Sequence, residues 1–174
     1  LLSLLPKMRG YDVVQLINPD CFALKAERQY YIFNYLMRHN AKVFVGAFGT
    51  DWCWVYSGLH DHLFRYGDYY IGNRQRLSEP SVKKDISEWI DTPKGEYSKY
   101  VHGHCHGIPA CLYEYYECYS RYFAGKTRFL PLPIVPQHHA PITPFEGFPI
   151  RFFIGIDTRR SQYKGTDIMY EALK

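Results

Sequence analysis

The chain has 174 residues, of which 47% are hydrophobic and 22% are charged, and its formal net charge is +4. This composition is that of a globular protein and excludes a disordered chain. No dense run of Lys or Arg occurs, so the sequence does not predict binding to nucleic acid, although a small anionic ligand is compatible with it.

The first part of the chain predicts a β-α-β unit. An apolar run at residues 13–17 predicts a buried strand. Apolar side chains that recur on one face predict a helix over residues 27–39, with Asn40 as a left-handed cap. A second buried strand is predicted over residues 42–47, before a glycine-containing turn. This alternation is typical of a parallel sheet with helices on both of its faces.

The middle of the chain is less regular. Residues 68–73 predict a short strand, and Pro80 begins a helix that we expect to end near residue 90. Thr92 and Pro93 are typical of the N-cap and the first position of a further helix. We expect this helix to end near Val101, because two glycines follow closely. Next come a predicted strand, a helix and a strand, over residues 107–112, 113–123 and 127–134.

A change in composition divides the chain. Residues 131–149 contain six prolines, which predict a semi-rigid, extended linker. Beyond it a short apolar strand and a helix predict the first unit of a second α/β domain. We therefore predict an N-terminal Rossmann-like domain, a linker and the start of a second Rossmann-like domain, at residues 1–132, 133–149 and 150–174.

The termini and the cysteines suggest a fragment of a cytoplasmic protein. The chain begins with Leu1 and ends inside a helical pattern, so we expect it to lack parts of a longer protein. The five cysteines are odd in number and lack the spacing of a secreted disulfide framework, so we expect reduced thiols. No apolar run reaches the ~18 residues of a membrane span.

Histidine and cysteine are concentrated in the stretch KYVHGHCHGIPAC, which contains His102, His104, Cys105, His106 and Cys111. A structural zinc site needs about four ligands, usually as two spaced pairs. Here the histidines alternate along the chain between glycines, and the only other such pair is in the predicted linker. The sequence therefore favours an exposed polar turn between a helix and a strand, and no metal.

Three segments resemble glycosyltransferases of the GT-B fold, specifically the family 4 group (glycosyl transferases group 1). VFVGAFGTDW is similar to the acceptor-domain strand that ends in a His-Gly-x-Asp turn, with Phe48 in the place of the His. HGIPACLYEYYECY is similar to the family's next strand-to-helix segment. FIGIDTRRSQYKGTDIMYEALK is similar to the start of the donor domain.

The resemblance implies a retaining transfer of a sugar from a nucleotide-sugar donor to a glycan or lipid-linked acceptor, in bacterial envelope polysaccharide synthesis. It implies no cofactor, no bound metal and no nucleic acid. A cytoplasmic location, with or without peripheral contact at the inner face of the membrane, would suit such an acceptor. The fragment itself is expected to be inactive, because its donor site is incomplete.

The donor diphosphate would be held by a basic loop, with Lys164, Gly165 and either Arg159 or Arg160. A leaving diphosphate gains negative charge as the glycosidic bond breaks, and cations beside a helix N-terminus stabilise that charge. The alternative is a solvated basic loop without a ligand.

The acceptor would contact a second set of residues: Gly49, Asp51, Trp52, Tyr113 and Glu114. They follow the predicted carboxyl ends of two strands, where open α/β sheets bind ligands. The alternatives are that Asp51 only caps the next turn and that Glu114 is an ordinary helix start. No catalytic residue is assigned, because Phe48 replaces the family's His.

Two other functions stay open at this point. The chain could be a non-catalytic Rossmann-like module that recognises a glycan or a partner protein. It could also be a metal or redox protein built on the His/Cys stretch. The oligomeric state and the sugars themselves are not determined by the sequence.

Overall fold

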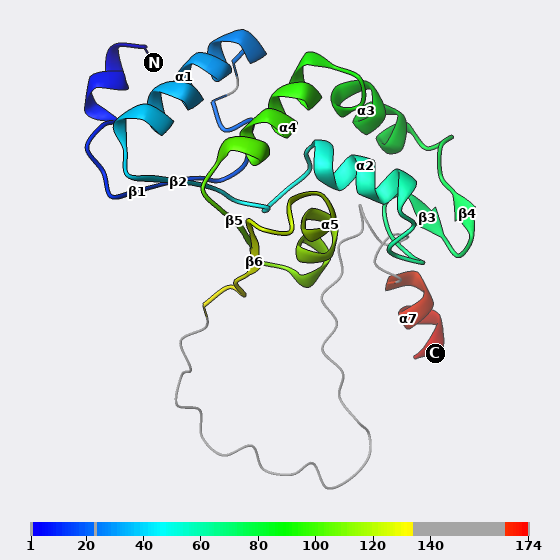
Figure 1. The fold of residues 1–174 in the computed structure, drawn as a ribbon. Coiled ribbons are helices and arrows are strands. Elements are labelled where there is room, and N and C mark those ends of the chain that lie inside the picture. The colour runs from blue at the N-terminus through cyan, green and yellow to red at the C-terminus, as the bar shows by residue number, and fades with distance from the viewer. Residues whose placement is uncertain (1, 23, 134–165, 174) are drawn as a thin grey trace, which may run out of the picture. The chain divides into compact units, whose positions relative to one another are not determined.

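A computed structural model describes residues 2–22, 24–133 and 166–173 (Figure 1). Its contacts divide the chain into two units, residues 1–132 and 133–174. The described part of the second unit contains helix α7 (Thr166–Ala172), where a helix was predicted. The predicted strand before it and all of the predicted linker except Pro133 lie outside the described residues.

The first unit is an α/β domain whose elements largely follow the prediction. In chain order they are a 3-10 helix η1 (Leu2–Lys7), β1 (Val13–Leu16), α1 (Ala26–His39), β2 (Lys42–Val45), α2 (Trp52–His60), β3 (Tyr70–Ile71), β4 (Arg74–Gln75), α3 (Pro80–Trp89), α4 (Pro93–His104), β5 (Ile108–Ala110), α5 (Tyr113–Phe123) and β6 (Thr127–Phe129). Helix α2 and η1 were not predicted, and the single strand expected at residues 68–73 is instead part of the antiparallel hairpin β3–β4.

Strands β1, β2, β5 and β6 all run parallel to one another. β1 pairs with β2, and β5 pairs with β6, both in parallel. Between the two pairs, the amide of Val45 donates to the carbonyl of Gly107 at 3.1 Å and that of Ala47 donates to Pro109 at 2.9 Å. The strands therefore lie in the order β1-β2-β5-β6. The predicted α/β class with parallel strands is confirmed, and the short strand pairs are compatible with a Rossmann-like fragment.

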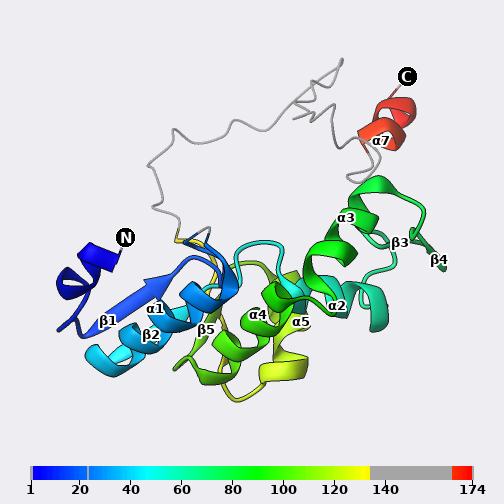
Figure 2. The same ribbon diagram turned by 90° about the horizontal axis from the view of Figure 1, so that it is seen from above.

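The helices cover one face of these strands, and both views place α1, α4 and α5 on the same side (Figures 1 and 2). The strand side chains beneath them are buried: Val43, Val45, Ile108 and Ala110. The alternate residues Phe44 and Pro109 are partly exposed. The prediction of helices on both faces is wrong for the described residues. Each successive strand lies on the same side of the one before it, in the order β1-β2-β5-β6. Right-handed crossovers between strands in this order place all of the connecting helices on one face of the sheet.

Two predicted helix ends differ from the structure. Helix α4 does not end at Val101 but continues to His104, and it includes Gly103. Asn40 does not adopt the left-handed conformation, because its backbone is extended, with φ −134°. Its side-chain amide instead donates to the carbonyls of Leu36 and Met8, both at 3.0 Å. A side-chain hydrogen bond thus caps α1 without a positive φ.

Candidate functional site

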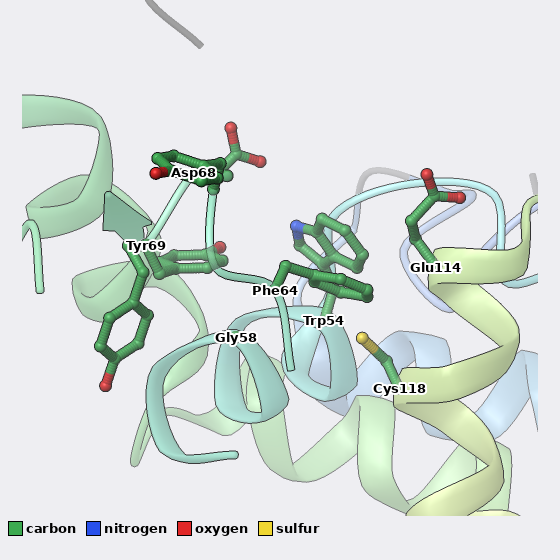
Figure 3. A pocket seen from close by; sticks show the side chains of 10 residues that line it. Trp54, Gly58, Phe64, Asp68, Tyr69, Glu114 and Cys118 are labelled. Carbon is green, nitrogen blue, oxygen red and sulfur yellow. The ribbon is translucent and has the colours of Figure 1, made fainter. Parts of the chain in front are cut away.

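A cavity of about 200 Å³ lies between α2, α5 and the chain that connects α2 to β3 (Figure 3). Its wall consists mainly of aromatic rings, together with two carboxylates, one thiol and two glycines. The lining residues are Trp54, Gly58, Phe64, Tyr66, Gly67, Asp68, Tyr69, Tyr70, Glu114 and Cys118. Apolar rings around a few polar groups are typical of small-molecule sites.

Trp54 forms one wall of the cavity from the first turn of α2. Its ring lies 4.9 Å from the ring of Tyr115 and 6.1 Å from that of Phe64, measured between centroids. Trp52, which sequence reasoning selected, is two residues earlier and therefore about 200° around the helix. It is buried against Tyr56, with a centroid distance of 4.8 Å, and it does not line the cavity.

Tyr69 belongs to the opposite wall, and its ring packs on α2 at Gly58. A Cβ atom at this position would lie 2.2 Å from the ring of Tyr69, so only glycine allows the ring to pack directly on the helix backbone. The Tyr69 hydroxyl donates to the Asp85 carboxylate of α3 at 2.9 Å. Burial, followed by the negative charge of Asp85, raises the pKa of Tyr69, which therefore stays protonated and keeps this hydrogen bond.

A buried guanidinium fixes the rim of the cavity. The Arg76 side chain is 4% exposed and donates to the carbonyls of Gly67 and Asp68, both at 3.3 Å. It also forms an ion pair with Glu79 at 3.8 Å. Charge-assisted hydrogen bonds of this kind are stronger than neutral ones. They hold the backbone that carries Asp68 in a defined position.

Two carboxylates lie at the cavity, and each belongs to a different wall. Glu114 is in the first turn of α5, and Asp68 is in the segment that Arg76 holds. Figure 3 shows their carboxylates on opposite sides of Trp54 and Phe64. Glu114 was predicted from the sequence, and the structure places it in the cavity wall. Its contact with an acceptor stays a prediction.

The other predicted acceptor residues do not line this cavity. Tyr113 is exposed and packs beside Tyr116 and Phe129, with both centroid distances at 5.9 Å. Gly49 has a negative φ and open space where a Cβ would be. Asp51 is buried and caps α2, because its Oδ1 accepts hydrogen bonds from the amides of Cys53 and Trp54. Of the two alternatives for this residue, the structure favours the cap.

The second carboxylate oxygen of Asp51, which does not take part in the cap, faces a histidine. His102 Nε2 of α4 lies 3.6 Å from Asp51 Oδ2, and both side chains are buried. The His102 ring packs edge-on against Tyr119 of α5 at 5.2 Å. Burial lowers the pKa of His102 below its ordinary value of 6.5, while the nearby Asp51 opposes this shift. His102 is therefore neutral in the folded protein at pH 7.

This burial predicts a pH-dependent stability. The unfolded chain takes up a proton on His102 as the pH falls through 6.5, whereas the folded chain does so only at lower pH. The free energy of unfolding should therefore fall below pH 6.5, by up to about 1.4 kcal/mol per pH unit, and level off below the folded pKa. Urea unfolding between pH 7.5 and 5.0 measures this slope.

The control compares two histidines of the same helix. His102→Phe should reduce the slope, whereas His104→Phe, at an exposed position, should leave it unchanged. Equal slopes in the wild type and the His102 variant would contradict the assignment.

The His/Cys stretch is dispersed in the structure. The His104 ring stacks on Tyr100 at 4.0 Å, and Nδ1 of His106 accepts a hydrogen bond from the amide of Val43 at 3.0 Å. Cys105 is buried, and burial raises its pKa to about 11. The prediction of an exposed turn is wrong for His102 and Cys105. Among the described residues, no group of three or more His, Cys, Asp or Glu could hold a metal.

The predicted donor residues lie outside the described part of the chain: Arg159, Arg160, Lys164 and Gly165. Sequence reasoning missed the aromatic wall, Trp54 and Phe64 above all. The available signal was the apolar run that follows Asp51, because an N-cap residue before such a run predicts a helix.

No helix in the described ranges has both the length and the apolar character that crossing a membrane requires. Comparison with protein-family models, with curated proteins and with solved structures gives no match for this chain. Its function must therefore be inferred from the geometry of the cavity and from its position in the α/β domain.

Proposed function

We propose that the chain is the acceptor-side domain of a glycosyltransferase with a GT-B fold, and that the aromatic cavity binds one sugar ring of the acceptor. The observation that carries this proposal is the combination of aromatic rings and two carboxylates around a cavity of about 200 Å³. Drug-sized ligands occupy about 300–1,000 Å³, so this volume suits a single small ring.

The chemistry of a pyranose matches such a wall. A sugar ring presents C–H groups on its faces, which pack by dispersion against aromatic rings such as Trp54 and Phe64. Its hydroxyls project from the ring edge and can donate hydrogen bonds to carboxylates, which act only as acceptors. Asp68 and Glu114 supply two such carboxylates.

The position of the cavity in the domain supports the same proposal. Trp54 follows the carboxyl end of β2, and Glu114 follows the carboxyl end of β5. Open α/β sheets bind ligands outside the carboxyl ends of their strands. An acceptor hydroxyl held there would attack the anomeric carbon of a nucleotide sugar while the diphosphate leaves, with retention of configuration.

The donor side of the proposal concerns Lys164, Gly165, Arg159 and Arg160. The lysine and one of the two arginines would stabilise the negative charge that the leaving diphosphate gains. A cytoplasmic location suits both the proposed donor and the five cysteines, which are all free thiols. An acceptor that belongs to the bacterial envelope would bring the domain to the inner face of the membrane.

A second candidate is a non-catalytic domain that binds a glycan. Phe48 favours it, because this side chain has no titratable group at the position where the resembling family has a His. A nucleotide-sugar transfer assay on a chain that carries the complete donor domain distinguishes the two functions. Transfer to an acceptor supports the enzyme, and glycan binding without transfer supports the second candidate.

Binding of neutral methyl glycosides tests the cavity directly. Tyr66→Ala should weaken binding about fivefold, on the order of 1 kcal/mol, because it removes one aromatic ring from the wall. The matched control is Tyr31→Ala, since Tyr31 lies on α1, does not line this cavity and is 60% exposed, compared with 65% for Tyr66. Amide chemical-shift titrations measure both affinities.

The expected shifts are centred on Gly67 and on the Trp54 indole. Binding that moves no resonance at the cavity, or that is lost equally in both variants, would exclude this cavity as the sugar site.

A further inference from the structure

The wall of the cavity has charge of only one sign. Among the described residues that line it, none is Lys, Arg or His, whereas Asp68 and Glu114 are both acidic and exposed. Figure 3 shows them on opposite sides of the Trp54 and Phe64 rings, so a ligand that packs on these rings would lie between the two carboxylates. A bound group with a negative charge would therefore meet repulsion from two directions.

Two arginines lie beside residues of the wall without lining the cavity themselves. The Arg76 guanidinium is buried behind the rim, where it contacts backbone carbonyls and Glu79. Arg65 lies closer to solvent, with its guanidinium carbon 5.6 Å from the centre of the Tyr66 ring, and it does not line the cavity. Because Arg65 lies over a ring that belongs to the wall, it is a cation that the experiment includes.

We propose that the cavity selects its sugar by charge. It accepts a neutral or amino-bearing pyranose, and it rejects one that carries a carboxylate, a sulfate or a phosphate. Juxtaposed like charges suppress binding of the wrong ligand even where its shape fits. An ammonium group is favoured instead, because carboxylates attract it and the faces of aromatic rings bind cations. This inference rests on the proposed function, since it assumes that the cavity binds a sugar ring.

The test uses three probes that differ in one substituent: the methyl glycosides of glucose, of 2-amino-2-deoxyglucose and of glucuronic acid. Chemical-shift titrations at pH 7 and low salt give the three dissociation constants. We expect the glucuronide to bind about tenfold more weakly than the glucoside, and the amino sugar to bind at least as tightly as the glucoside. Added salt should reduce these differences, because it screens exposed charges.

Matched variants locate the effect. Glu114→Gln should reduce the difference between glucoside and glucuronide to about threefold, since one of two carboxylates is removed. Glu117→Gln is the control, because it makes the same charge change on α5 at a residue that does not line the cavity. This control should keep the wild-type preference.

The outcomes separate the inference from the proposed function. If none of the three glycosides binds, the sugar site itself is refuted. If all three bind equally, or if the glucuronide binds tightest, the site stands and selection by charge is overturned. A tight glucuronide complex that is lost in Arg65→Gln would also overturn it, and would assign the recognition of the sugar's charge to Arg65.

Discussion

Gly95→Ala is expected to lower the free energy of unfolding by about 3 kcal/mol, at the upper end of the range for overpacked interiors. Gly95 is buried in the first turn of α4, and its amide donates to Thr92 Oγ1 at 3.0 Å. A Cβ at this position would lie 2.0 Å from the carbonyl oxygen of Trp89. This neighbour is backbone at the end of α3, so relief requires that α3 and α4 move apart.

The same substitution elsewhere in α4 provides the control. Gly103 is exposed, and a Cβ there would meet no atom within 4 Å. Gly103→Ala should therefore stabilise the protein by about 0.5–1 kcal/mol, since alanine has the higher helix propensity. Urea unfolding followed by circular dichroism measures both variants. If both substitutions changed the free energy of unfolding in the same direction, the close contact between α3 and α4 would not be what decides the effect at Gly95.

Asp51→Ala is expected to lower the free energy of unfolding by about 3 kcal/mol. Loss of an N-cap side chain alone costs about 1 kcal/mol, and a buried polar group left without its partner costs about 1–3 kcal/mol more. Both effects apply, because Asp51 caps α2 and one of the amides that it accepts from belongs to Cys53, which is fully buried. Since Trp54 belongs to the capped turn, the variant should also weaken glycoside binding.

Two further variants separate the causes. Asp51→Asn keeps an oxygen that can accept the capping hydrogen bonds, so it should cost about half as much. Thr92→Ala removes the cap of α4 at a half-buried position without an ionisable partner, and should cost about 1 kcal/mol. Chemical unfolding at pH 7.5 gives all three values. If Asp51→Ala costs no more than Thr92→Ala, the buried environment of Asp51 contributes nothing.

The sequence by itself determined those elements whose signals are local. Thr92 and Pro93 fix the start of α4 through a hydroxyl that accepts an amide hydrogen bond and a ring that presets φ. The helix at Tyr113–Phe123 was predicted with the observed bounds. The parallel arrangement followed from strands that alternate with helices, because a parallel pair needs a long crossover. Each of these signals lies within a few consecutive residues.

The sequence did not show which side chains of a helix are buried. The stretch around His102 is polar in composition. In the structure it forms the last turn of α4, and His102 lies on the face of this helix that is buried. Trp52 and Trp54 are chemically alike, and only their positions around α2 separate the core residue from the cavity residue. A sequence shows which side chains are apolar. The packing of neighbouring elements decides which side of each helix is covered.

The cavity itself exists only in the tertiary structure. Asp68 and Glu114 are distant in sequence, yet both line the cavity, because Tyr69 packs on Gly58 while Arg76 holds the backbone of Gly67 and Asp68. None of these contacts has a local sequence signature. A glycine marks where close approach is allowed, but not which ring will use it. Contacts between remote segments form only when the whole domain packs, so their geometry, and the charge of the cavity that results, was decided by the fold.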